Sequence, residues 1–227
     1  MLRLVDARTL VSVLALLCTL QPLQAQEAQP KQPSPEEALK RLKEGNSRFV
    51  ADKLAERNLG KTRRAELAKG QAPFAIVLGC ADSRVVPELL FDQGLGDLFV
   101  IRVAGNVTDP AIVGSIEYAV EHVRTPLIVV LGHEGCGAVK AALAKGELHG
   151  NLAELIKLVK VGEGLPSDTA AKTEAAIKNN AKYHADRLRK QSPLINDFAA
   201  SGRVRIVAAT YSLKIGAVEW LQAPDKK

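Results

Sequence analysis

The sequence predicts an α/β fold with a mostly parallel central sheet, flanked by helices and preceded by an N-terminal helical arm. Of the 227 residues, 47% are hydrophobic and only 4% are aromatic, which indicates one globular domain with an aliphatic core. Four short aliphatic runs without strict alternation indicate strands that are buried on both faces. Helical stretches separate these runs, an alternation that is typical of βαβ units.

The helical arm is expected to begin at Ser34. The run Ser34-Pro35-Glu36-Glu37 supplies an N-cap, a proline at the first helical position and a capping-box glutamate. A second, basic helix is expected at 62–69. The strands are expected at 74–78, 98–103, 127–131 and 204–209. Further helical stretches are expected at 114–123, 138–144, 152–161 and about 169–198, with a C-terminal strand or turn within 210–221.

Residues 1–25 have the features of a secretory signal peptide. Arg3 and Arg8 give a basic start, the apolar run that follows is too short to span a bilayer, and Leu23-Gln24-Ala25 offers a small residue at a plausible cleavage point. The mature chain is then expected to begin near Gln26, to be periplasmic or secreted, and to have no stable membrane association. An uncleaved membrane anchor is the alternative, because Asp6 interrupts the basic region.

The net charge is modestly positive, at +6. Removal of residues 1–25 takes away two arginines and one aspartate, so the charge falls from +6 to +5. A small excess of this kind usually belongs to solvated helix surfaces, and no aromatic residues alternate with the basic ones as a nucleic-acid platform requires. Nucleic acid is therefore not an expected partner.

Two of the predicted strands end in pairs of metal ligands. The run FAIVLG is followed by Cys80 and Asp82, and the run PLIVVLG is followed by His133 and Cys136. In open α/β sheets, ligands bind outside the carboxyl ends of the strands. Thiolate, imidazole and carboxylate are donors that suit zinc. The sequence therefore predicts a zinc site at this edge of the sheet.

A disulfide is the competing interpretation of the two cysteines. After cleavage Cys80 and Cys136 are the only ones left, an even pair in a compartment that permits disulfides, and the chain would then be a stapled binding module without catalysis. A disulfide needs neither Asp82 nor His133 at these spacings, so the pattern favours zinc. Taken singly, Asp82 could instead be an N-cap, with Arg84 as its surface ion-pair partner.

Taken together, these motifs resemble the signature of β-class carbonic anhydrases. The runs that carry the resemblance are C-A-D-S-R at 80–84, R-V-A-G-N at 102–106 and G-H-E-G-C-G at 132–137. The resemblance spans about residues 34–221. It implies a lyase that hydrates carbon dioxide reversibly to bicarbonate and a proton, with a catalytic domain at 34–227. The polar, Gln- and Pro-containing composition of residues 26–33 separately indicates a flexible lead before that domain.

The resemblance also implies a role for each motif residue. One Zn²⁺ per chain would be held by Cys80, His133 and Cys136, and the fourth position would be taken by water or, in a closed resting form, by Asp82. Arg84 would hold the Asp82 carboxylate away from the metal, so that Asp82 can orient the reacting water. Asp82 and Arg84 are therefore the expected catalytic residues.

By the same resemblance, Gln71, Phe99 and Tyr118 would line the carbon dioxide pocket, which in this family is completed across a dimer interface. A homodimer or homotetramer is implied. Core packing is the plainer interpretation of Phe99 and Tyr118, and Ala104 departs from the bulkier aliphatic residue expected at its pocket position. A related zinc hydrolase acting on carbon disulfide or carbonyl sulfide could use the same ligands.

Overall fold

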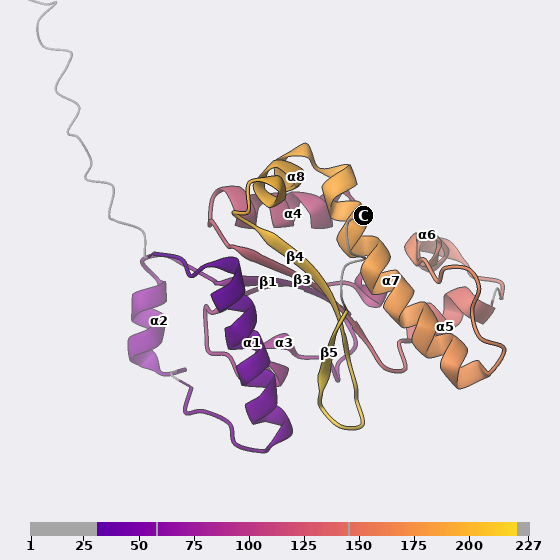
Figure 1. Ribbon diagram of the computed structural model, residues 1–227, viewed down its shortest axis with the longest axis horizontal. Coiled ribbons are helices and arrows are strands. Elements are labelled where there is room, and N and C mark those ends of the chain that lie inside the picture. Colours follow the sequence, from indigo (N-terminus) through magenta and orange to yellow (C-terminus); the bar gives the residue numbers. More distant parts are fainter. Residues whose placement is uncertain (1–30, 58, 145, 222–227) are drawn as a thin grey trace, which may run out of the picture. The chain divides into compact units, whose positions relative to one another are not determined.

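The protein forms a five-stranded sheet with helices on both faces (Figure 1). The computed structural model describes residues 31–57, 59–144 and 146–221, so the expected signal peptide and most of the flexible lead lie outside the described residues. The strand order is β2-β1-β3-β4-β5, and only β5 is antiparallel to its neighbour. The strands are β1 (Ala75–Gly79), β2 (Leu98–Arg102), β3 (Leu127–His133), β4 (Arg205–Tyr211) and β5 (Val218–Leu221). The predicted fold class is confirmed.

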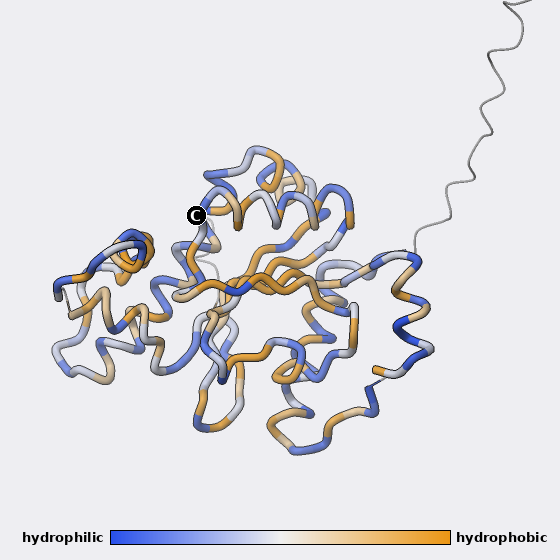
Figure 2. Tube along the Cα trace, turned by 180° about the vertical axis from the view of Figure 1, so that it is seen from behind, coloured by the Kyte–Doolittle hydropathy of each residue, from blue (hydrophilic) through white to orange (hydrophobic). Residues whose placement is uncertain are grey.

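The sheet is the middle of three layers. Helices α4, α7 and α8 cover one face, and α1 and α3 cover the other. Every residue of β1 and β3 is buried, and the sheet forms the hydrophobic centre of the trace in Figure 2. The helices are α1 (Pro35–Val50), α2 (Lys61–Leu67), α3 (Pro87–Leu90), α4 (Pro110–Glu121), α5 (Gly137–Ala144), α6 (Gly150–Leu158), α7 (Thr169–Gln191) and α8 (Pro193–Ala200). A short 3₁₀ turn, η1 (Ala104–Asn106), follows β2.

Helix α1 begins as its sequence predicts. The Ser34 hydroxyl accepts a hydrogen bond from the Glu37 amide, and the Glu37 carboxylate accepts one from the Ser34 amide. This reciprocal pair is the capping box. The apolar side of α1, including the buried Leu39 and Leu42, packs on this chain's own sheet. None of the residues of α2 is buried.

The helical stretch expected at 169–198 is two helices. Ser192 is both the C-cap of α7 and the N-cap of α8. Its amide donates to the Leu188 carbonyl in the last turn of α7, and its hydroxyl accepts from the Ile195 amide in the first turn of α8. Pro193 explains the break. A proline disfavours helical geometry in the residue before it but fits the first position of a new helix.

The strand order places a topological switch point between β1 and β3. From β1 the chain crosses to β2 on one side, and it then returns to β3 on the other side. The carboxyl ends of β1 and β3 are therefore neighbours whose connections diverge, which is where open α/β sheets bind ligands. Cys80 follows β1 and His133 ends β3, so the two predicted ligand pairs meet here.

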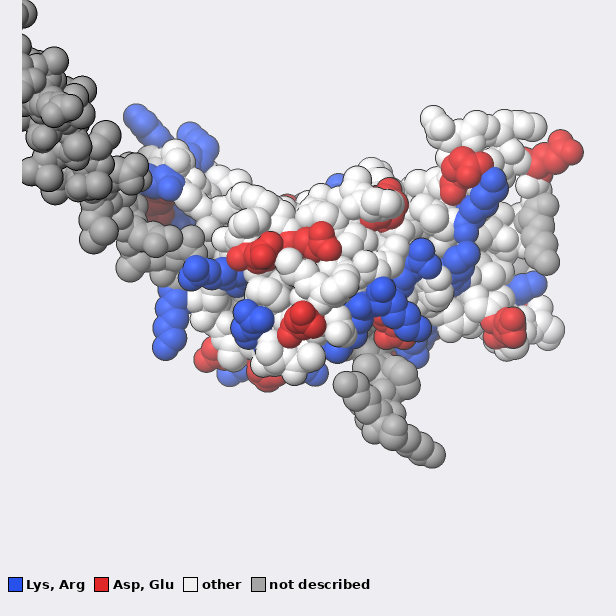
Figure 3. All heavy atoms as spheres, turned by 90° about the horizontal axis from the view of Figure 1, so that it is seen from above, with Lys and Arg blue, Asp and Glu red and all other residues white. Residues whose placement is uncertain are grey.

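The charged side chains are mixed on the surface. On the face that Figure 3 shows, basic and acidic side chains are interspersed rather than segregated. Across the described part of the chain, no helix has both the length and the apolar character to cross a bilayer.

Candidate metal centre

Three predicted ligands meet beyond the carboxyl ends of β1 and β3. The ligand atoms of Cys80, His133 and Cys136 all lie within 4.8 Å of one another, and all three residues are buried. Cys136 directly precedes α5, and its carbonyl accepts the first helical hydrogen bond, from the Lys140 amide. A hydrophobic cluster that includes Val107 and Val139 surrounds the two sulfurs.

The orientation of His133 leaves one ring nitrogen for a ligand. Its Nδ1–H donates to the Glu134 carbonyl at 2.9 Å, which fixes the tautomer with a lone pair on Nε2. That Nε2 is buried and has no hydrogen-bond partner among the described residues. Buried polar atoms are normally paired, so an unpaired nitrogen beside two sulfurs fits a metal ligand.

The two cysteines of the described part of the chain are free thiols that lie side by side and are not bridged. The two sulfurs share one proton more easily than they release two, so the neighbouring Cys136 thiol lowers the pKa of Cys80 to about 4, whereas Cys80 raises the pKa of Cys136. Burial opposes ionisation of both. Two thiolates in this apolar cluster need a cation to compensate their charge, and a divalent metal meets that need.

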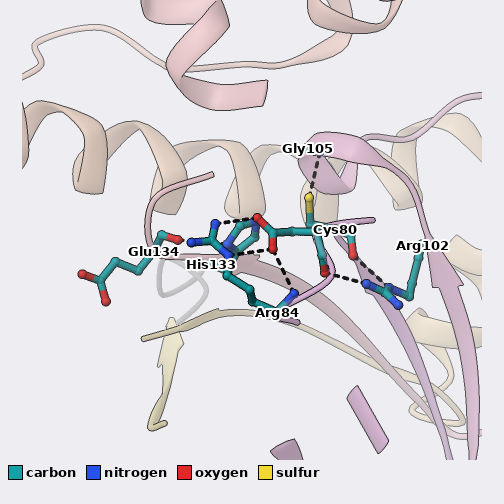
Figure 4. Close-up of polar contacts among 7 residues, drawn as sticks. Cys80, Arg84, Arg102, Gly105, His133 and Glu134 are labelled. Carbon is teal, nitrogen blue, oxygen red and sulfur yellow. Dashed lines mark hydrogen bonds and ion pairs between the residues drawn. The ribbon is translucent and has the colours of Figure 1, made fainter. Parts of the chain in front are cut away.

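Asp82 is held beside the cluster by Arg84, whose guanidinium hydrogen bonds are dashed in Figure 4. Arg84 Nε donates to Asp82 Oδ1 at 2.9 Å and its second guanidinium nitrogen donates to Oδ2 at 2.7 Å, while the Arg84 amide also donates to Oδ1. These bonds hold the pKa of the Asp82 carboxyl well below its usual range. Asp82 Oδ2 lies 3.9 Å from His133 Nε2, so the carboxylate stands at the edge of the cluster.

The strand ends are braced by residues that the sequence analysis did not single out. Arg102, at the end of β2, donates to the Cys80 carbonyl at 3.0 Å and to the Asp82 carbonyl at 2.6 Å. The Gly105 amide donates to Cys80 Sγ at 3.4 Å. Both residues lie in the R-V-A-G-N run, which the sequence analysis quoted as part of the family resemblance without giving either residue a role.

Comparison with known proteins agrees with this geometry. A family model described as carbonic anhydrase matches residues 75–218. The chain is 45% identical to a carbonic anhydrase of Mycolicibacterium smegmatis over 82% of this chain and 93% of that protein. It is 44% identical to carbonic anhydrase 2 of Mycobacterium tuberculosis over 81% of this chain and 91% of that protein. The chain belongs to the β-carbonic anhydrase family.

Solved β-carbonic anhydrases share the fold. An enzyme from Coccomyxa in complex with acetazolamide is 30% identical, with a TM-score of 0.63 over 70% of this chain and 77% of that one. Tetrameric enzymes from Sordaria macrospora are represented by a chain that is 28% identical, with a TM-score of 0.65 over 70% of this chain and 86% of that one. The predicted family is confirmed, and carbon dioxide hydration is the activity of that family.

Within one chain, the expected pocket residues do not lie beside the cluster of Cys80, His133 and Cys136. Gln71 is exposed and precedes β1, whereas Cys80 follows that strand. The four steps from Ala75 to Gly79, at about 3.3 Å each, put roughly 13 Å between the two ends of β1. Phe99 lies early in β2, paired with Ile76, and stacks on the half-exposed Tyr118 with ring centroids 6.5 Å apart.

Proposed function

We propose that this chain catalyses the zinc-dependent, reversible hydration of carbon dioxide to bicarbonate and a proton. The observation that carries the proposal is the buried cluster of Cys80, His133 and Cys136, in which the His133 Nε2 lone pair has no partner among the described residues. Two thiolates and an imidazole are preferred zinc donors, and three protein ligands leave the open fourth position that a catalytic zinc needs.

One Zn²⁺ per chain would be held by Cys80, His133 and Cys136. When bound there, zinc supplies the Lewis acidity that lowers the pKa of water to about 7 and so provides a nucleophile for carbon dioxide. The Glu134 carbonyl orients the His133 ring by accepting its Nδ1–H, which strengthens Nε2 as a donor.

In this mechanism Asp82 orients the reacting water and Arg84 governs Asp82. A bidentate guanidinium keeps the carboxylate ionised and would restrain it from turning onto the ligand position, while Oδ2, which accepts only one bond from Arg84, has a second lone pair for a hydrogen bond from water. The bonds between Arg84 and Asp82 support an open resting site, in which Asp82 is not itself a ligand. Accepting that hydrogen bond aims the water's lone pair at the carbon.

We further propose that a second copy of the chain supplies the substrate pocket. Gln71 of that copy would donate its amide to a substrate oxygen, and Phe99 with Tyr118 would provide the apolar wall. Three observations support a homodimer or homotetramer. These side chains are distant from their own cluster, β2 is at the edge of the sheet that residues 31–221 form in the described ranges, and the Sordaria macrospora enzymes are described as tetrameric.

The proposed setting is periplasmic or extracellular. Residues 1–25 would be removed as a signal peptide, leaving a lead at 26–33 and the catalytic domain at 34–227. N-terminal sequencing of the protein from the periplasmic fraction tests this, and an intact Met1 on cytosolic protein would contradict it.

The decisive experiment measures zinc content, free thiols and carbon dioxide hydration on one sample of the mature protein. We expect one zinc per chain, two thiols that react once zinc is chelated, and hydration that a chelator abolishes and zinc restores. A metal-free protein with both cysteines oxidised would overturn the proposal in favour of a stapled binding module.

A further inference from the structure

Asn180 is a fully buried amide in α7 with two directed hydrogen bonds. Its Oδ1 accepts from the Lys160 amide at 2.8 Å, and its Nδ2 donates to the Gly105 carbonyl at 2.8 Å. A backbone amide can only donate and a carbonyl can only accept, so these two partners fix which way the Asn180 side chain points.

Gly105 connects this amide to the metal centre. It lies in the middle of η1 with φ 75° and ψ 12°, and its N–H donates to Cys80 Sγ at 3.4 Å (Figure 4). A Cβ at this position would lie 3.1 Å from side-chain atoms of both Ala138 and Val159, so the turn requires glycine. Glycine also visits many other conformations, and the turn therefore needs an outside contact to hold it.

We propose that Asn180 is a positioning residue of the metal centre. By holding the Gly105 carbonyl, it keeps the Gly105 N–H aimed at the Cys80 sulfur. Asn180 thereby acts on a zinc ligand from another element, 100 positions along the chain, without touching the ligand itself. The inference rests on the zinc site proposed above.

The expected effect follows from the chemistry of thiolate ligands. A hydrogen bond from an amide to a thiolate is charge-assisted, and it fixes where the sulfur sits. Partners of this outer kind typically change metal affinity by about 10- to 100-fold when they are removed. Without Asn180 the Gly105 turn relaxes, Cys80 loses its amide donor, and zinc leaves more easily.

The test compares Asn180→Ala with Asn179→Ala. Asn179 is a matched control, because its Nδ2 donates to the Val161 carbonyl at 3.0 Å, in the same loop as Lys160 but away from Gly105. Zinc-loaded wild-type and variant proteins are compared at a temperature at which all are folded. The readouts are the rate of zinc transfer to a chelator and the hydrogen exchange of the Gly105 amide.

We expect Asn180→Ala to release zinc about tenfold faster than wild type. The hydrogen exchange of its Gly105 amide should also be faster than in wild type. Asn179→Ala should match wild type in both. If Asn180→Ala behaves like Asn179→Ala in both readouts, Asn180 only joins α7 to the turn and the inference is wrong. Asn180→Asp replaces it if the alanine variant does not fold, because Asp keeps an acceptor for Lys160 while its other oxygen cannot hold the Gly105 carbonyl.

The two proposals can fail separately. If wild-type protein binds no zinc, the zinc site is wrong, and Gly105 exchange in metal-free protein still tests the contact with Asn180. If wild type binds zinc and Asn180→Ala releases it at the wild-type rate, only the role of Asn180 is wrong.

Discussion

The two ends of the same sheet differ in how complete they are within one chain. At the carboxyl end, Cys80, His133 and Cys136 converge, and Asp82 is clamped at their edge. At the amino end and along the β2 edge, Gln71 is exposed, Tyr118 is half-exposed and Phe99 is partly buried against the core, away from that cluster.

This difference separates two parts of the proposed function. A metal centre needs donors fixed to within fractions of an ångström, and strand ends braced by Arg102 and Gly105 supply that rigidity inside one chain. A pocket for a small apolar substrate needs side chains that line it, and a second copy of the chain can supply them. Metal binding should therefore depend on the single fold, whereas hydration should also depend on assembly.

The largest effect is expected from removing a metal ligand. Cys136→Ser takes away one thiolate, so bound zinc should fall from one per chain to almost none, and hydration should be lost with it. Metal analysis of the purified protein measures this. The control is Gln71→Ala with Tyr118→Ala, which changes exposed residues at the other end and should leave zinc in place. If the Cys136→Ser protein and the Gln71→Ala, Tyr118→Ala protein bound equal amounts of zinc, metal binding would not be specific to the carboxyl end of the sheet.

Arg84→Ala is expected to abolish hydration while zinc stays bound. Without the guanidinium, the Asp82 carboxylate is free to turn onto the metal position and to close it. Stopped-flow hydration assays and zinc analysis on the same sample separate the two effects. Arg84→Lys keeps the charge but not the bidentate fork, and it should retain part of the activity. Wild-type turnover in Arg84→Ala, or loss of its zinc, would contradict the proposed role.

Mixed oligomers test whether the pocket comes from a second copy. One chain carries Cys136→Ser, and the other carries Gln71→Ala with Tyr118→Ala, so each homo-oligomer has only defective sites. In a mixed dimer, the intact metal centre of the second chain faces the intact pocket residues of the first. Co-expressed, tandem-tagged hybrids should recover about half of the wild-type hydration rate per dimer, one site in two being whole. Activity no higher than the homo-oligomer mean would place the pocket elsewhere.

The smallest effect concerns stability in acid. His184, on α7, is buried, and its pKa is lowered to about 4, chiefly by that burial and in smaller part by the charges of Arg187 and Lys160, against an opposing contribution from the Leu158 backbone. The folded chain thus binds fewer protons than the unfolded chain below about pH 6.5, so stability falls as pH drops from there towards 4. We expect a loss of roughly 2 kcal/mol between pH 7 and pH 5.

Urea unfolding at the two pH values measures this loss, and His184→Gln supplies the comparison. A glutamine oxygen can accept the hydrogen bond that His184 Nδ1 takes from the Thr108 amide, but the side chain does not titrate. The variant should lose less stability than wild type over the same interval. An identical loss in both proteins would assign the acid sensitivity to other groups.

Much of the fold and the ligand set could be predicted because their signals are local. The aliphatic runs located the first four strands, the Ser34 capping box located α1, and ligand residues directly after two strands predicted the metal cluster. Ser192-Pro193 is also a local signal for the end of one helix and the start of the next. The prediction of a single helical stretch missed it because the residues on both sides favour helix.

The remaining features depend on residues that are distant in the sequence. The order β2-β1-β3, which brings Cys80 beside His133, is set by how the helices cover the two faces of the sheet. Glu134 binds Ser212 and Lys214, and Asn180 holds Gly105, across separations that no periodicity encodes.

The sequence by itself thus determined the family, the parallel strands and the chemical types of the ligands, because propensity, capping and motif spacing act over a few residues. Only the tertiary structure decided that the Asn180 amide donates to the Gly105 carbonyl, and that the expected pocket residues lie at the other end of the sheet. Those outcomes depend on long-range packing, which brings side chains together irrespective of their distance along the chain.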